Sequence, residues 1–139
     1  MSAMRGAAAY SRGAGAYAKV GVESGVMSAS PHQLIVMLFD GALTSIRAAR
    51  LHLSEGNIPA KGKAISKALD IVNNGLLAAL DAEQGGEVAE RLASLYDYIA
   101  RLLLTANLHN DEKSLDEAVH LLEDIGSAWR EIGSQASGV

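Results

Sequence analysis

Apolar residues recur every three or four positions over most of the chain, and this spacing limits the fold more than any other feature. The clearest case runs from 87 to 110, where the apolar positions step by 4, 3, 4, 3 and 4. They are Val88, Leu92, Leu95, Ile99, Leu102 and Ala106. Steps of this kind place one apolar stripe along an α-helix, in the pattern of a helix bundle. No alternating strand pattern in the sequence competes with it.

The first helix has the clearest start signal. Ser30 is suited to the N-cap, Pro31 stands at the first helical position, and Gln33 has the capping-box offset. Near Ser114 the fourth helix opens in a similar way, with Glu117 at that offset. The predicted helices are 31–54, 59–82, 87–110 and 114–132. The stripes expected in the core of the other three helices are Leu34, Leu38, Ala42, Ile46, Ala49 and Leu53; Ile65, Leu69, Val72, Leu76 and Leu80; and Leu115, Leu122, Ile125, Trp129 and Ile132.

Four long helices joined by short loops predict an all-α fold, an antiparallel up-down-up-down four-helix bundle over 30–133. A disordered tail is expected over 134–139. Residues 1–29 are rich in Gly, Ala and Ser and are expected to form a flexible arm. Two interpretations of the arm stay open: a free tail, or a lid that docks its apolar residues on the bundle. Those residues are Tyr10, Tyr17, Val20 and Val22.

Composition and charge exclude several classes of protein. The chain is 49% hydrophobic and 20% charged, so it has enough apolar residues for a core. Its net charge of −4 argues against a nucleic-acid-binding protein, and the absence of cysteine excludes disulfides and thiolate metal sites. The longest apolar run, 34–39, is far shorter than the roughly 20 residues of a membrane span. A soluble cytoplasmic protein without stable membrane insertion is therefore expected.

Helices 31–54 and 87–110 carry more apolar residues than one buried stripe needs. The stretch LIVMLF at 34–39 is apolar all the way round, and the run Leu102 to Leu104 cannot all face one core. Either these helices are central and covered by their partners, or they border an exposed groove that binds an apolar chain. The residues predicted to line such a groove are Val36, Met37, Phe39, Leu43, Leu95, Tyr96, Ile99, Leu103 and Asn107.

Asn107 is the polar member of this set. Its amide can both donate and accept, so it is predicted to pair with the backbone of a bound chain; a helix C-terminal cap or a solvated amide is the alternative. Catalytic and metal signals are weak. Glu117 and His120 have the spacing of one half of a di-iron site, but the second half is missing. No catalytic residue, metal or cofactor is therefore predicted.

Four stretches resemble one known family. They are VMSASPHQLIVMLFDGAL (26–43), LYDYIARLLLTANLHND (95–111), AYAKVGVESGV (16–26) and LDEAVHLLEDIGSAW (115–129). In this order they are similar to the flagellar secretion chaperone family FliS, from about residue 16 to 132. By position, the matching residues are Tyr17, Ser28 to Pro31, Leu34, Met37, Leu38, Phe39, Asp40, Gly41, Leu95, Tyr96, Tyr98, Arg101, Leu103, Ala106, Asn107 and Asp111. Phe39 stands where the family often has tyrosine, and Leu102 where it often has a second arginine.

The resemblance implies a chaperone without enzymatic activity or cofactor. It implies that the bundle binds the disordered C-terminal segment of flagellin in the bacterial cytosol, prevents premature polymerisation and keeps flagellin competent for type III secretion. The chaperone–flagellin complex would then meet the flagellar export gate. A monomer or weak dimer that binds no nucleic acid is expected. A self-associating structural bundle without a flagellin client, and a bundle metalloenzyme, are the alternatives.

Overall fold

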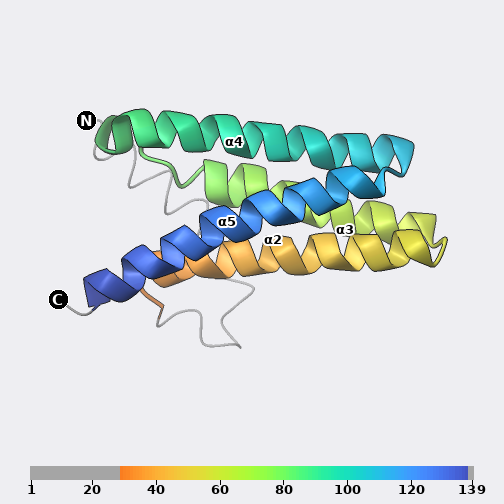
Figure 1. The fold of residues 1–139 in the computed structure, drawn as a ribbon, viewed down its shortest axis with the longest axis horizontal. Coiled ribbons are helices and arrows are strands. Elements are labelled where there is room, and N and C mark those ends of the chain that lie inside the picture. The colour runs from red at the N-terminus through yellow and green to blue at the C-terminus, as the bar shows by residue number, and fades with distance from the viewer. Residues whose placement is uncertain (1–28, 138–139) are drawn as a thin grey trace.

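The computed structural model describes residues 29–137, including every side chain except those of 82–84 and 134–137. All regular structure in this range is helical (Figure 1). The elements are α2 (Pro31–Ser54), α3 (Ile58–Asp70), the π-helix η3 (Ile71–Leu77), α4 (Ala82–His109) and α5 (Glu112–Ser137). This confirms the predicted all-α bundle. The predicted arm over 1–29 lies almost wholly outside the described residues.

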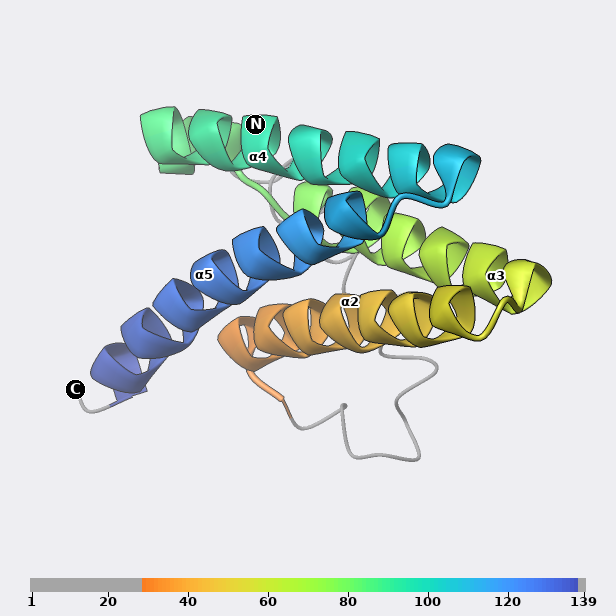
Figure 2. The same cartoon turned by 45° about the vertical axis from the view of Figure 1, so that its right-hand side comes forward.

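The helices alternate in direction along one long axis. α2 packs between α3 and α5, and α4 packs against α5 on one side and against α3 and η3 on the other. Figures 1 and 2 show that α5 begins beside the end of α4 and ends beside the beginning of α2. Because α5 runs obliquely in this way, it diverges from α4 toward the beginning of α4. The bundle is therefore closed at one end and opens at the other.

The start of α2 follows the sequence prediction. Ser30 Oγ accepts from the Gln33 backbone N–H at 3.2 Å, and Gln33 Oε1 accepts from the Ser30 N–H at 2.8 Å. Together with Pro31 at the first turn, this capping box fixes the helix start because it satisfies two backbone donors that otherwise lack partners.

The second helix differs from the regular helix predicted over 59–82. α3 begins at Ile58, after its N-cap residue Asn57, and ends at Asp70. η3 follows directly, from Ile71 to Leu77. η3 contains the run Asn73, Asn74 and Gly75, and these residue types are among the weaker α-helix formers. The buried face also differs from the prediction: Ala68 and Ile71 are buried, whereas the predicted core residues Leu69 and Leu80 are only partly buried.

The last two helices also differ at their ends. α4 is interrupted at Gly86, whose φ of 53° is a left-handed conformation, so its regular part begins at Glu87 as predicted. α5 begins at Glu112 because Asp111, and not Ser114, caps it: Asp111 Oδ1 accepts from the Lys113 N–H at 3.1 Å. It extends past the predicted end at 132. Ile132 is exposed, so its predicted place in the core is wrong.

Candidate functional site

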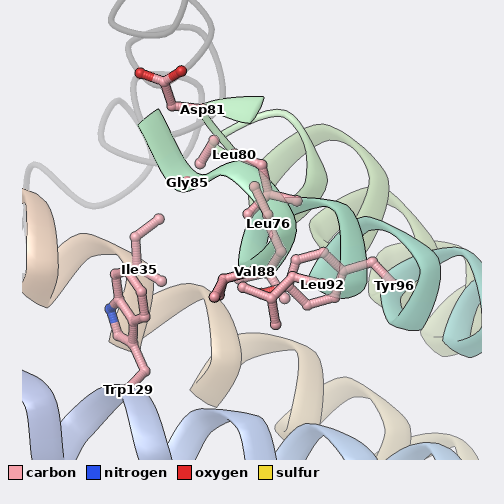
Figure 3. Close-up of a pocket in the computed structure, with 11 residues that line it drawn as sticks. Ile35, Leu76, Leu80, Asp81, Gly85, Val88, Leu92, Tyr96 and Trp129 are labelled. Atoms are coloured by element: carbon pink, nitrogen blue, oxygen red, sulfur yellow. The ribbon is translucent and has the colours of Figure 1, made fainter. Parts of the chain in front are cut away.

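An apolar cavity of about 260 Å³ lies at the open end of the bundle. Ile35 from α2, Leu76 from η3, Val88 and Leu92 from α4, and Trp129 from α5 converge on it (Figure 3). Its other lining residues are Ala79, Leu80, Asp81, Gly85, Ala89 and Tyr96. Asp81 is the one charged residue among them, so the cavity suits an apolar side chain.

The cavity exists because of the breaks in the helices around it. η3 ends at Leu77, and the irregular turn that follows places Leu80 at the cavity. Across from it, the interruption at Gly86 precedes Val88, whose side chain is 66% exposed at the rim. The sequence placed Val88 on the core stripe. In the structure it is exposed and lies in the lining of the cavity instead.

The wall contributed by α5 is aromatic. The rings of Trp129 and His32 stack with centroids 5.2 Å apart and planes 14° apart. Trp129 Nε1–H also donates to the His32 carbonyl oxygen at 3.4 Å. Sequence reasoning placed Trp129 on a core stripe and gave it no role in a site. Only the oblique course of α5, which the sequence does not reveal, brings Trp129 to the open end.

Five of the nine residues predicted for the groove are buried among the helices of this chain: Phe39, Leu43, Tyr96, Ile99 and Leu103. Phe39 lies against α5, where a Cβ built on Gly126 would be 3.3 Å from its ring, and its ring is 6.3 Å from that of Tyr96. For Phe39 and Leu43 the helices themselves therefore cover the second apolar face of α2. This is the alternative in which α2 is simply a central helix.

Tyr96 joins this buried set to the cavity, because it is 3% exposed and still contributes to the lining. Burial raises the pKa of its phenol well above the ordinary value of 10.0. The raised pKa means that burial disfavours the ionised phenol, so Tyr96 contributes a neutral group to the apolar wall.

The other four predicted residues are accessible. Met37 is exposed, and Val36, Leu95 and Asn107 are partly buried. The Asn107 carbonyl accepts from the Nζ of the buried Lys61 at 2.9 Å, which joins the beginning of α3 to the end of α4. The Asn107 amide faces Gly62 on α3, so the two helices are close at this point. The predicted lid residues Tyr10, Tyr17, Val20 and Val22 lie outside the described residues.

A second apolar area lies at the closed end of the bundle. Leu104 is 55% exposed and Leu108 is 78% exposed, on adjacent turns near the end of α4. Ile58, at the beginning of α3, is also exposed. The contact between Lys61 and Asn107 places these three residues at one end of the molecule. The sequence carried a signal for Leu104, since the three consecutive leucines cannot all face one core, but not for Leu108.

Charged residues line the contact between α2 and α5. Arg47 pairs with Glu123 at 3.4 Å, Arg50 with Asp116 at 2.8 Å, and Arg130 with Asp40. A polar pocket of about 180 Å³ is lined by the residues of the first and third pairs and by Phe39 and Leu43. These partly exposed pairs contribute little each, but together they favour one register of α5 on α2.

Residues 29–137 were also compared with the requirements of a metal site and of a membrane span by their side chains and hydropathy. They contain no group of three or more His, Cys, Asp or Glu side chains that could hold a metal ion. Among their helices, none is both long enough and apolar enough to cross a membrane.

Comparison with known proteins identifies the family. The family model described as flagellar protein FliS matches residues 13–136. A flagellar secretion chaperone FliS of Salmonella typhimurium is 57% identical over 122 residues, which cover 88% of this chain and 90% of that protein. The proteins of the same name from Escherichia coli and Vibrio cholerae are 46% and 39% identical, over 86% and 84% of this chain and 88% and 85% of theirs.

These matches cover most of the chain, and they confirm the resemblance of its four sequence stretches. The relatives are named as chaperones of flagellar secretion. The chain therefore belongs to the flagellar secretion chaperone family FliS, and it is a flagellar export chaperone and not an enzyme.

Proposed function

We propose that the chain binds the disordered C-terminal segment of flagellin in the bacterial cytosol. Binding would prevent premature polymerisation, keep flagellin competent for type III secretion and bring the complex to the flagellar export gate. The observation that carries this proposal is the apolar cavity that the four helices leave open beside Trp129. An export chaperone needs such a surface, because its client is held before it has folded or assembled.

Energetics require more than one contact. Ordering a flexible client costs about 1–2 kcal/mol per residue in backbone entropy. Burial of apolar surface returns roughly 25 cal/mol per Å², so a single cavity does not offset the ordering of a long segment. We therefore include the exposed residues Leu104, Leu108 and Ile58 in the proposed client surface. The client would run along the bundle and place apolar side chains at both ends.

The nine residues predicted from the sequence take two roles in this proposal. Val36, Met37, Leu95 and Asn107 are accessible and would contact the client directly. The buried residues Phe39, Leu43, Tyr96, Ile99 and Leu103 would support the surface from beneath.

Residues 1–29 are proposed as a lid on the cavity. Their deletion should then tighten the binding of a flagellin C-terminal peptide and increase the binding of a dye that reports apolar surface. Unchanged affinity and unchanged dye binding would leave the segment as a tail.

Calorimetric titration with a peptide of the flagellin C-terminal segment tests the proposed function. We expect saturable binding with a negative heat-capacity change, the sign of apolar burial. A scrambled peptide of the same composition is the control. A wild-type protein that binds neither peptide, and that forms a stable dimer through Leu104 and Leu108 in sedimentation, would favour the self-associating bundle instead.

A further inference from the structure

Near its end, α5 contacts the beginning of α2 through Trp129 and His32. His32 contacts Trp129 twice, through the stacked rings and through its carbonyl oxygen, which accepts from the indole N–H. Stacking fixes the plane of the indole, and the hydrogen bond fixes which edge of it faces α2. The orientation of Trp129 therefore depends on the position of His32.

Gly133 follows Trp129 by one helical turn, and it is buried. A Cβ built on Gly133 would lie 1.7 Å from Nε2 and 2.1 Å from Cδ2 of the His32 ring. No side chain fits at such distances unless the imidazole moves. Because the imidazole is stacked on Trp129, moving it would remove the stacking contact that fixes the plane of the indole. Any residue larger than glycine at 133 is therefore incompatible with the observed stack.

The indole in turn forms the α5 side of the cavity. Figure 3 shows it beside Ile35 and across from Val88 and Leu92. Its orientation therefore affects the shape of the space between this wall and the α4 wall. With Trp129 as observed, the cavity of about 260 Å³ is bounded mostly by aliphatic and aromatic groups, with Asp81 as the one charged residue of its lining. Such a space favours aliphatic client side chains and rejects charged ones, which would lose their hydration there.

We infer that His32 and Gly133 are positioning residues that hold Trp129 as one wall of the cavity, and that they thereby determine which client side chains fit. This inference rests on the proposed function, since it assigns the residues that shape the same site. His32 and Gly133 do not line the cavity, yet the Cβ position of Gly133 is closer to another side chain, that of His32, than the Cβ position of any other described glycine. The inferred positioning role explains this close contact.

A double-mutant cycle tests it in the full chain. The variants are Gly133→Ala, His32→Ala, both together, and His32→Phe, which retains an aromatic ring for stacking. We expect Gly133→Ala to weaken binding of the flagellin C-terminal peptide about tenfold, a change within the range of coupling for residues in contact. In the His32→Ala background the same replacement should change binding less than about twofold, because the clashing ring is gone. His32→Phe should keep binding close to wild type.

Fluorescence supplies an independent readout, because Trp129 is the one tryptophan in the chain. Gly133→Ala should shift its emission toward that of a solvated indole, and His32→Phe should not. The matched control is Gly62→Ala, a glycine-to-alanine change in another helix whose Cβ would meet only Asn107 Oδ1, at 3.6 Å. It should leave the emission unchanged. Because Gly62 lies against Asn107, the control for binding is Ser66→Ala, an exposed change in the same helix, which should leave binding unchanged. Urea unfolding of each variant confirms that it is folded.

The outcomes separate the two proposals. Equal loss of binding from Gly133→Ala with and without His32, or no loss in either background, would overturn the positioning role. If the wild-type protein does not bind the peptide, the proposed function fails. The emission of Trp129 in the four variants then still decides whether His32 and Gly133 position the indole.

Discussion

Lys61 is the one charged side chain that is buried among the described residues, at 2% exposure. Its Nζ donates to the Asn107 carbonyl at 2.9 Å, near the end of α4. Cations are favoured at this position, because the last carbonyls of a helix lack partners and carry partial negative charge. This hydrogen bond thus holds α3 against α4 near the exposed residues Leu104 and Leu108.

We predict that Lys61→Met lowers the free energy of unfolding by about 1.5–3 kcal/mol, the usual range for a hydrogen bond to a charged group. Methionine keeps most of the apolar stem, so the change isolates the loss of the ammonium. Urea unfolding measures it, with the exposed Lys63→Met as the matched control, expected within about 0.5 kcal/mol of wild type. Equal stability of the two variants would mean that the buried ammonium contributes nothing net.

Tyr96 gives a prediction about alkaline pH. Burial raises its pKa above the ordinary value of 10.0. In the unfolded chain the phenol ionises near the ordinary value, whereas in the folded protein it remains protonated. Stability is therefore full below pH 10 and falls as the pH rises from there toward the folded pKa.

Tyr96→Phe should reduce this alkaline loss of stability, measured as the free energy of unfolding on both sides of pH 10. Some loss should remain, because a hydrogen bond to Glu117 also raises the pKa of Tyr98. The control is Tyr98→Phe, whose exposed ring should contribute less. An unchanged pH dependence in Tyr96→Phe would contradict the burial of a neutral phenol.

Among the helices, the ends that depend on local chemistry could be predicted from the sequence. The start of α2 at Pro31 was predicted, because Ser30 and Gln33 satisfy its backbone donors without help from other helices. η3 could not be predicted in the same way. Its weak helix formers do not specify one geometry, and the buried contacts of the segment, such as Ile71 beside Gly41 of α2, join residues far apart in the sequence.

The cap of α2 can be tested directly. Ser30→Ala removes the acceptor of the Gln33 N–H and should cost about 0.5–2 kcal/mol of stability. Ser66→Ala, an exposed position inside α3, is the control and should be neutral or slightly stabilising, because alanine is the better helix former. Thermal unfolding of both variants measures the difference. A loss in Ser30→Ala no larger than in the control would show that the capping box does not stabilise α2.

In the molecule as a whole, the sequence indicated that apolar residues are in excess but not where the excess is exposed. Phe39, Leu43 and Leu103 were assigned to a groove, yet the packing of α5 and α3 buries them. The exposed excess instead lies at Val88, which the periodicity placed on the core stripe, and at Leu108, which lies outside that stripe. Where the excess is exposed depends on how the four helices pack together, including the oblique course of α5 toward the beginning of α4, and not on any one helix.

Val88 and Leu108 lie 20 residues apart on α4, which corresponds to about 30 Å along a helix. A client that contacts both must be long, and its second contact forms at a high effective concentration once the first has formed. We predict that Val88→Glu and Leu108→Glu each weaken the binding of a full-length flagellin C-terminal peptide about tenfold. The losses of binding free energy should add in the double variant, because the two sites are far apart.

Half-length peptides make this prediction specific. Each half should be sensitive to one replacement and indifferent to the other, and each should bind far more weakly than the whole. Both side chains are exposed, so the glutamates should change stability little, which urea unfolding checks. Glu90→Gln, at an exposed site between them, is the control for a change of surface charge. If Leu108→Glu leaves the affinity for the full-length peptide unchanged, the client surface does not extend to Leu108 and ends at the cavity. The ordering of the rest of the client would then need another source of free energy.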